Sequence, residues 1–333
     1  MTAVRIGVLG CADIARRRMM PAMAAARGVE LVAVASRDLA KARETADRFR
    51  CAPVRGYGEL LERDDVDAVY VPLPAALHAE WARAALLAGK HVLAEKPLST
   101  ELDSTRELLE LARERGLVLM ENVMFVHHPQ HRAVLDLVED GAIGELRSFQ
   151  STFTIPALPD DDIRHRPELG GGALWDTGVY PVRAALHLLR RELDVVGATL
   201  SVSPGRQIDT AGAVLFQAEG EVSVQLSFGL DHAYRSSYEL CGTTGRLVLD
   251  RAFTPPADHV PVLRWERETI VEYVELEPFD QVAATVAAFA GAVDAGMAGG
   301  VGDSLRQAVL LDGIRRAAEH SSSTQNRYAG MVI

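Results

Sequence analysis

The sequence is poor in cysteine, and the three cysteines that it has are far apart, at Cys11, Cys51 and Cys241. No two of them form a C-x-x-C pair, and an odd, scattered set provides no disulfide framework. A reducing compartment fits this usage, so we expect a cytoplasmic protein.

Long hydrophobic runs and excess positive charge are lacking as well. No apolar run reaches the roughly 18 residues that a membrane span needs, so we expect no membrane partner. The first apolar run, residues 4–9, fits a strand of the fold better than a secretory signal. The formal net charge is -11, and such a field repels nucleic acid. A small anionic ligand remains possible, because it needs only a local basic pocket.

What the sequence does have is two parts with different patterns. Its 333 residues are too many for one ordinary core, so two domains are expected. In the first part, short β-rich runs alternate with helical patterns, which is typical of a parallel sheet with right-handed crossovers. The expected strands are 4–9, 31–36, 67–73, 91–96 and 117–122, and the expected helices are 13–26, 38–49, 76–88 and 100–115.

The pattern changes after about residue 122. Residues 221–228 alternate between apolar and polar side chains, and a glycine-rich turn at 242–245 separates two further strands. Such strands indicate a mostly antiparallel sheet with one polar face. We therefore predict an α/β protein, with a Rossmann-type parallel-sheet domain over 1–122 and an α+β domain with a large, mostly antiparallel open sheet over 123–333. Further helices are expected at 129–139, 174–190, 280–295 and 302–320.

The stretch GCADIA, which follows the first strand, fits the motif G-x-G-x-x-G/A with alanine at the middle glycine. The first glycine makes the tight turn, and small residues let the backbone approach a pyrophosphate at the helix N-terminus. The motif alone is weak, but its place in the first strand–turn–helix unit favours dinucleotide binding. The predicted contacts are Gly10, Cys11, Ala12, Asp13 and Ile14.

The end of the second strand bears on the choice between NAD and NADP. NAD sites usually have Asp or Glu there, whereas this strand ends in Ser36 and Arg37. Arg37 can pair with a 2′-phosphate, and Ser36 can donate to it. Asp38 is expected to cap the next helix. NADP(H) is therefore the predicted cofactor.

Several motifs in one order make the sequence similar to the glucose–fructose oxidoreductase / inositol dehydrogenase / MocA-type family over nearly its whole length. They are GCADIA, ASR, VPLPAALHAEWARAALLAGKHVLAEKPL, GGGALWDTGVYPVR and YELCGTTGRL. Within that family, MENVMFVHHPQHRAV, SFQSTFTIP, DHAYRSSYE and RAFTPPA resemble the NADPH-dependent nucleotide-sugar 3-ketoreductases of actinomycete deoxysugar biosynthesis.

The resemblance implies a catalytic group in the EKP motif. Lys96 would lie at the carboxyl edge of the parallel sheet, beside the nicotinamide and the substrate oxygen. The Lys96–Pro97 bond that follows is commonly cis in the family. A buried ammonium can have a lowered pKa and exchange protons near neutrality.

The DTGVY motif supplies the second pair of predicted catalytic residues. Asp176 and Tyr180 are four residues apart and share one helix face. The resemblance implies that this helix faces the nicotinamide, and that both side chains contact substrate or relay protons. A nearby ammonium lowers the pKa of a phenol, so Tyr180, or Lys96 through it, is the expected proton donor. Lys96 would also stabilise the developing negative charge.

Further ligand contacts are expected near these motifs. Arg164 lies in a basic stretch before the DTGVY helix and is expected to hold a diphosphate, while three glycines at 170–172 could approach the cofactor closely. His127 and His131 are four residues apart but have no third ligand, so no metal site is predicted. The remaining cofactor contacts are Pro72, Leu73, His78, Glu95, Lys96 and Arg164. The substrate contacts are Lys96, Asn122, His128, Arg164, Asp176 and Tyr180.

The expected reaction is reduction, by NADPH, of the C3 ketone of a nucleotide-linked, dTDP-type 3-keto or 3,4-diketo deoxysugar in antibiotic biosynthesis. A dehydrogenase of a free sugar, an inositol or a dihydrodiol is the first alternative. A non-catalytic NADP-binding regulator is the second, against which the intact Lys96, Asp176 and Tyr180 argue. The expected partners are the nucleotide-sugar and further copies of the chain, because the second sheet forms an oligomer face in many relatives.

Overall fold

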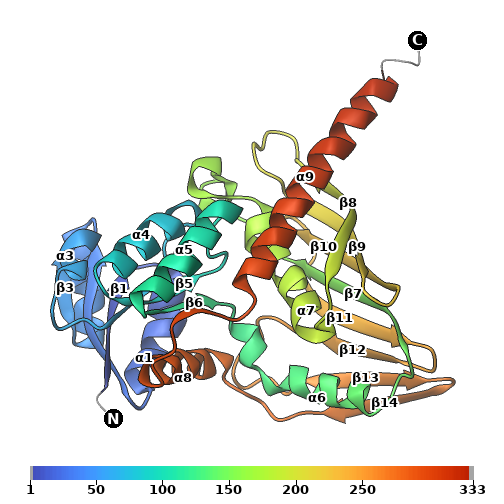
Figure 1. Cartoon of the computed structure of the whole chain (residues 1–333), viewed down its shortest axis with the longest axis horizontal. Helices are drawn as coiled ribbons and strands as arrows, with labels where there is room; N and C mark the ends of the chain where they lie inside the picture. Colours follow the sequence, from blue (N-terminus) through green and yellow to red (C-terminus); the bar gives the residue numbers. More distant parts are fainter. Residues whose placement is uncertain (1–2, 330–333) are drawn as a thin grey trace. The chain divides into compact units, whose positions relative to one another are not determined.

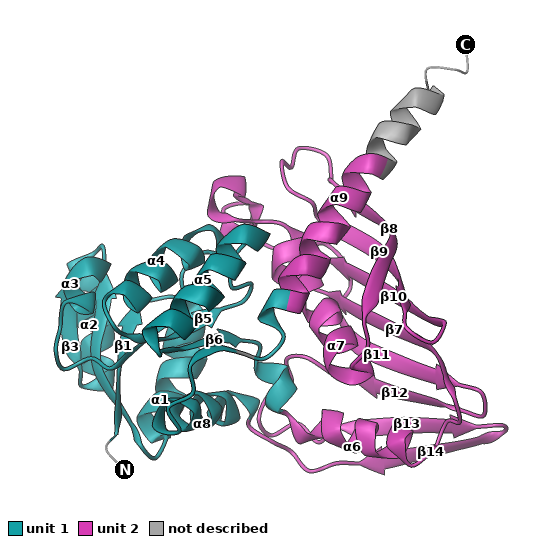
Figure 2. Cartoon of the chain, viewed as in Figure 1, with its two compact units in different colours: residues 1–127, 281–305 teal, residues 128–280, 306–333 magenta. Residues whose placement is uncertain are grey.

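The computed structural model describes residues 3–329, with side chains described for 3–300 and 302–320. Contacts divide these residues into two compact units (Figure 1, Figure 2). Unit 1 contains the chain up to His127 and the later segment Gln281–Leu305. Unit 2 contains His128–Asp280 and the described chain from Arg306 onward.

Unit 1 is built on a seven-stranded parallel sheet with the strand order β15-β6-β5-β4-β1-β2-β3. The chain runs outward from β1 in one direction and then crosses over to β4. Ligands bind at such a switch point, outside the carboxyl ends of the strands. The strands are β1 (Val4–Leu9), β2 (Val29–Ser36), β3 (Ala52–Arg55), β4 (Ala68–Val71), β5 (His91–Glu95), β6 (Val118–Asn122) and β15 (Gly299–Val301).

Helices cover both faces of this sheet, because strands buried on two sides need two apolar partners (Figure 1). Along β4, Val69 and Val71 belong to the core with α4 and α5, while Tyr70 belongs to the opposite core with α1 and α8. The helices of this unit are η1 (Ala15–Met19), α1 (Met20–Ala25), α2 (Leu39–Phe49), α3 (Tyr57–Leu61), α4 (Ala75–Leu87), α5 (Leu102–Arg115), η2 (Met124–His127) and α8 (Gln281–Asp294).

The return of the chain to unit 1 differs from a simple division at residue 122. Val286 and Phe289 of α8 are fully buried in the same core cluster as Met19 and Tyr70. The short strand β15 then pairs with β6 in parallel. The predicted second domain, 123–333, includes residues 281–305, which the structure places in unit 1. A three-residue strand has no detectable alternation, so the sequence gives no sign of this return.

Unit 2 is built on an eight-stranded sheet in the order β14-β13-β12-β11-β7-β10-β9-β8. All of its pairs are antiparallel except β7 with β10. The predicted alternation of β10 is confirmed: Val222, Val224, Leu226 and Phe228 are buried. The strands are β7 (Leu146–Thr154), β8 (Leu193–Ser201), β9 (Ala211–Ala218), β10 (Val222–Gly229), β11 (Arg235–Gly242), β12 (Arg246–Asp250), β13 (Val262–Arg267) and β14 (Ile270–Glu275).

One largely buried helix, α7, lies on the sheet of unit 2, and the π-helical turn η5 precedes it (Figure 1). Of the described helices, none is both long and apolar enough to cross a membrane. The two sheets and their order confirm the predicted fold class. The helices are α6 (Pro129–Glu139), η3 (Ile163–His165), η4 (Pro167–Leu169), η5 (Leu174–Gly178), α7 (Val179–Leu189) and α9 (Ser304–Ala329).

Candidate functional site

The predicted dinucleotide loop lies at the carboxyl end of β1. Gly10 has a φ of +120°, and its N–H donates to the carbonyl oxygen of Ala35 at 2.9 Å. A Cβ there would lie 3.0 Å from Leu73 Cδ2 and 3.8 Å from the carbonyl oxygen of Pro72. Only glycine suits both the backbone angle and the space. The structure thus brings three of the predicted cofactor contacts, Gly10, Pro72 and Leu73, together.

Two of the helices predicted to face the ligands begin with a π-helical turn. η1 follows the GCADIA loop, and η5 contains Asp176. Single π-helical turns occur frequently at functional sites, because the extra residue re-aims the side chains around it. Sequence periodicity predicted regular helices over 13–26 and 174–190, since a single wide turn leaves no distinct pattern.

A hollow of about 400 Å³ lies beside this loop in unit 1. It is lined by Cys11, Ser36, Arg37, Asp38, Lys41 and Tyr57. The Asp38 carboxylate accepts from the N–H of Ala40 at 2.9 Å, which confirms the predicted cap of α2. That carboxylate is therefore engaged at the helix end, while Arg37 and Lys41 supply positive charge. Such a lining fits an anionic 2′-phosphate better than a ribose hydroxyl.

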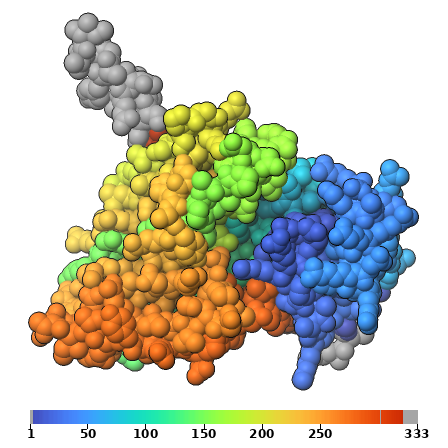
Figure 3. Space-filling view, turned by 180° about the vertical axis from the view of Figure 1, so that it is seen from behind, coloured from blue at the N-terminus to red at the C-terminus, as the bar shows by residue number. Residues whose placement is uncertain are grey.

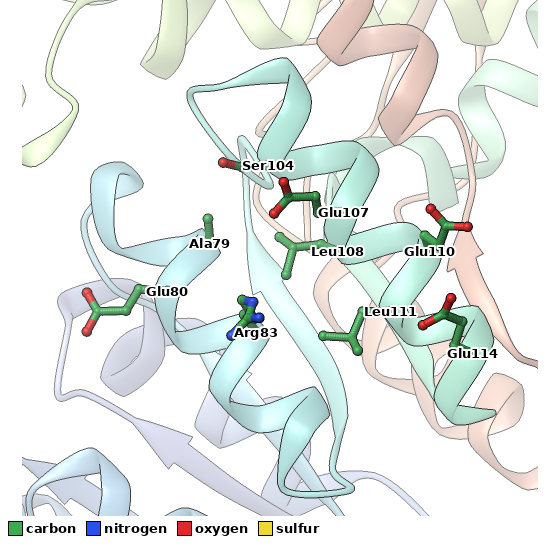
Figure 4. A pocket seen from close by; sticks show the side chains of 9 residues that line it. All are labelled: Ala79, Glu80, Arg83, Ser104, Glu107, Leu108, Glu110, Leu111 and Glu114. Atoms are coloured by element: carbon green, nitrogen blue, oxygen red, sulfur yellow. The ribbon is translucent and has the colours of Figure 1, made fainter.

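A second hollow, of about 620 Å³, lies between α4 and α5 (Figure 4). Its lining combines apolar side chains such as Leu108 and Leu111 with four glutamates and Arg83. None of the predicted cofactor, substrate or catalytic residues lines it. The chemistry of the side chains, rather than the size of a hollow, therefore identifies the candidate site.

The EKP motif follows β5, and the Lys96–Pro97 bond is cis, as the resemblance implies. Glu95 Oε1 accepts hydrogen bonds of 2.6 Å from the hydroxyl of Tyr70 and from the amide of Asn122. These donors belong to the neighbouring strands β4 and β6, so the carboxyl ends of three strands are joined beneath Lys96. Asn122, predicted to contact substrate, is buried, and its amide nitrogen donates to Glu95.

His78, predicted to contact the cofactor, is buried between two turns of the same edge. Its Nδ1 lies 2.6 Å from the carbonyl oxygen of Pro97, and its Nε2 lies 2.6 Å from that of Leu73. Burial lowers the pKa of the ring, while these two carbonyl oxygens favour the protonated form. The ring therefore joins the turn after Lys96 to the turn beside Gly10.

In unit 2 the predicted site residues Arg164 and Asp176 form an ion pair. Arg164 Nε donates to Asp176 Oδ2 at 2.7 Å, and Asp162 lies on the other side of the guanidinium at 3.3 Å. The charge of Asp176, followed by that of Asp162, raises the pKa of Arg164. Arg164 is still 40% exposed, so it retains access to a ligand while it orients the carboxylate.

Tyr180 lies in the first turn of α7, and its ring packs edge-on against Phe153 and at a tilt against Phe253. The ring centroid of Phe153 is 4.7 Å away, and that of Phe253 is 5.7 Å away. The side chain is only partly buried. Packing of the ring therefore holds the direction of the hydroxyl without enclosing the residue completely.

The structure places two further residues at the starts of helices. His128, a predicted substrate contact, is buried and caps α6, because its Nδ1 accepts from the N–H of Gln130 at 3.1 Å. Burial lowers its pKa to about 4. Asp209 was not predicted at all, yet its carboxylate accepts from the N–H of Leu174 at 2.7 Å, where η5 begins. No motif surrounds Asp209, so only the structure identifies it.

Comparison with known proteins agrees with this arrangement. Residues 4–123 match the model of the oxidoreductase family with an NAD-binding Rossmann fold, and residues 131–248 match the GFO/IDH/MocA C-terminal domain. A dTDP-3,4-didehydro-2,6-dideoxy-alpha-D-glucose 3-reductase of Streptomyces violaceoruber is 55% identical, covering 95% of this chain and 96% of that protein. An enzyme of the same name from Actinomadura kijaniata is 52% identical, covering 95% of this chain and 96% of that protein.

Among solved structures, the 3-ketoreductase KijD10 of Actinomadura kijaniata, in complex with NADP and TDP-benzene, superimposes with a TM-score of 0.92. It is 51% identical, and the match covers 95% of this chain and 98% of that one. Both parts of the chain thus match the same family in sequence and in fold. The chain belongs to the GFO/IDH/MocA family of oxidoreductases.

Proposed function

We propose that this protein is an NADPH-dependent reductase of the C3 ketone of a dTDP-linked 3,4-diketo-2,6-dideoxy sugar. The observation that supports this most strongly is the level of identity, over half in the Streptomyces violaceoruber relative and across 95% of this chain. Substrate choice follows the site rather than the fold. The candidate site residues therefore have to account for the same reaction.

The proposed catalytic pair has support from solved variants of KijD10. One has a single tyrosine replaced by phenylalanine, and another has a single lysine replaced by alanine. The two replaced residues are separated in sequence by the same number of positions as Lys96 and Tyr180 are here. This equal spacing supports the assignment of Lys96 and Tyr180 as the residues that matter for the chemistry.

In the proposed mechanism the bound NADPH supplies the hydride that the ketone carbon receives. Tyr180 donates its phenolic proton to the alkoxide oxygen that forms. The ammonium of Lys96 favours release of that proton and stabilises the negative charge on the oxygen. Asp176, oriented by Arg164, accepts a hydrogen bond from a hydroxyl of the sugar, and Arg164 approaches the diphosphate through its exposed side.

NADP is the proposed cofactor because the hollow beside the GCADIA loop is lined by two positively charged side chains. Arg37 would pair with the 2′-phosphate, and Lys41 would add a second positive charge. Cys11, Ala12, Asp13 and Ile14 would bring backbone close to the pyrophosphate. Turnover with NADPH and little with NADH is the expected result.

A homo-oligomer formed through the sheet of unit 2 also belongs to the proposal. Leu215 on β9 and Val196 on β8 are 42% and 61% exposed. The β13–β14 hairpin, orange in Figure 3, adds Val271 and Tyr273, which lie on one face of β14 and are 49% and 66% exposed. Exposed apolar surface of this kind marks interaction sites. Light scattering coupled to gel filtration should give a mass above the 36.1 kDa of one chain.

The test of the proposed function is loss of NADPH absorbance with the dTDP-linked diketo-sugar, generated in place by the dehydratase that precedes it. Free D-xylose and an inositol, each offered with NADP+ and followed as a gain of NADPH absorbance, serve as comparison substrates, because relatives at 34% and 29% identity are named as dehydrogenases of such compounds. Turnover limited to the nucleotide-sugar supports the proposal. Turnover limited to a free sugar or an inositol would contradict it.

A further inference from the structure

The connection between β8 and β9 ends in a carboxylate that contacts a distant helix. Asp209 Oδ2 accepts a hydrogen bond of 2.7 Å from the N–H of Leu174, and its carbonyl oxygen accepts one of 2.8 Å from Ala173. Both donors lie where η5 begins, and N–H groups at a helix start have no partner within the helix. Asp209 therefore caps the helix that carries Asp176 and Tyr180.

The glycines before that helix are held between Asp209 and the turn of Arg164. Gly172 has a φ of +123°, and a Cβ on it would lie 2.5 Å from Asp209 Oδ1. A Cβ on Gly171 would lie 2.4 Å from the carbonyl oxygen of Arg164, to which the N–H of Gly172 donates at 3.0 Å. Close packing within unit 2 thus explains these two glycines, which leave no room for any side chain.

These contacts form a closed set around the start of the helix. The Asp209 carboxylate accepts from the N–H of Leu174, and the carbonyl oxygen of Arg164 accepts from the N–H of Gly172. The guanidinium of Arg164 in turn donates to Asp176. Burial raises the pKa of Asp209, and the hydrogen bonds from backbone N–H groups offset only part of this rise. A carboxylate at this end also interacts favourably with the helix dipole. The position of the Asp209 side chain is therefore fixed by hydrogen bonds as well as by packing.

We propose that Asp209 is a positioning residue for the reduction, acting through the start of the helix that carries Asp176 and Tyr180. The inference rests on the proposed function, because it assigns Asp209 to the reaction in which those two residues take part. Misplacement of a reacting group by about 1 Å can cost on the order of 100-fold in rate. A cap that fixes the helix start is thus expected to affect turnover more than cofactor affinity.

The test compares Asp209→Ala with Asp209→Asn, which keeps an acceptor oxygen, and with Asp231→Ala. Asp231 is a suitable control because it accepts from Ser203 in the same connection and lies in a neighbouring turn. We expect Asp209→Ala to lower kcat for the diketo-sugar by about 10–100-fold while the NADPH Kd stays within about twofold. Asp209→Asn should recover most of kcat, and Asp231→Ala should match the unaltered protein.

Hydrogen exchange of the Leu174 amide provides a readout that needs no substrate. Exchange should be faster in Asp209→Ala and restored in Asp209→Asn. Unchanged kcat and exchange in Asp209→Ala, equal damage in Asp231→Ala, or no recovery in Asp209→Asn would each overturn the proposal. If Asp209→Ala does not fold, Asp209→Ser takes its place, with an intermediate kcat and exchange rate expected. If the unaltered protein does not reduce the sugar, the proposed function fails, and exchange alone then decides whether Asp209 holds the helix.

Discussion

The two units hold their candidate site residues in different ways. In unit 1 they lie in turns at the carboxyl ends of adjacent parallel strands, where the ladder fixes the backbone and the Glu95 and His78 side chains add contacts between neighbouring strand ends. In unit 2 they lie on one helix and one loop, joined by side-chain contacts such as Arg164 with Asp176 and Asp209 with Leu174. Single side chains should therefore matter more for the geometry of unit 2, and backbone turns more for that of unit 1.

The largest effect is expected from the proposed catalytic pair, one residue from each unit. Lys96→Ala combined with Tyr180→Phe should lower kcat by about 10²–10⁴-fold, because both the proton donor and its activating charge are lost. The NADPH Kd, measured by fluorescence titration, should change little. Lys90→Ala is the matched control, since Lys90 lies before β5 and donates to the carbonyl oxygens of Arg63 and Val66. Wild-type turnover in the double variant would remove the pair from the mechanism.

Cofactor choice should depend on one side chain in unit 1. Arg37→Ala is expected to reduce the preference for NADPH over NADH by about 10–100-fold, because a charge-assisted hydrogen bond to the 2′-phosphate is lost. The measurement is kcat/KM for each cofactor. Arg43→Ala, on the exposed side of the following helix α2, should leave the preference unchanged. An unaltered preference in Arg37→Ala would place the phosphate contact elsewhere.

Loss of the ion pair between Arg164 and Asp176 should have a smaller effect, which is seen in the KM of the nucleotide-sugar. Arg164→Ala should raise the KM of the nucleotide-sugar by about tenfold, since Asp176 loses its orienting partner and the diphosphate loses a charge. Arg166→Ala breaks only an exposed pair with Glu168 and should leave KM within about twofold. Equal KM values in the two variants would show that Arg164 neither orients Asp176 nor contacts the substrate.

The smallest effect concerns the stability of unit 2 in acid. The pKa of His128 is about 4 in the folded chain and 6.5 in the unfolded one, so the unfolded chain binds more protons below 6.5. Its contribution to stability is therefore present above pH 6.5 and is lost as the pH falls toward about 4. His128→Asn keeps a capping oxygen without this titration, so its Tm should fall less over that window. An identical pH dependence of Tm in both proteins would contradict this origin.

The sequence predicted most where local pattern and site coincide. The strand 4–9 and the helix 129–139 were predicted with the bounds that the structure has, and GCADIA was correctly placed in a turn after a strand. A glycine turn and a capping Asp38 leave a signal within a few residues. The same is true of β10, whose alternation is regular.

The sequence could not predict features that depend on distant packing. The strand β15 has three residues, and only its pairing with β6 makes it recognisable as a strand. Asp209 lies 35 residues after Leu174, and no spacing rule connects a loop carboxylate to a helix start. The π-helical turn around Asp176 and the burial of His128 likewise follow from contacts that local periodicity does not contain. Three of these four features, all but β15, lie in unit 2, which was therefore the harder of the two to predict.

A deuterium label on the cofactor tests directly whether this protein reduces C3 of a nucleotide-linked sugar. The dTDP-linked diketo-sugar would be reduced with NADPH that carries deuterium at the transferred position of the nicotinamide, and the product would be examined by NMR. We expect one deuterium at C3 of a sugar that is still linked to dTDP. Deuterium at any other carbon, or a product without deuterium, would contradict the assignment of this protein as a nucleotide-sugar 3-ketoreductase.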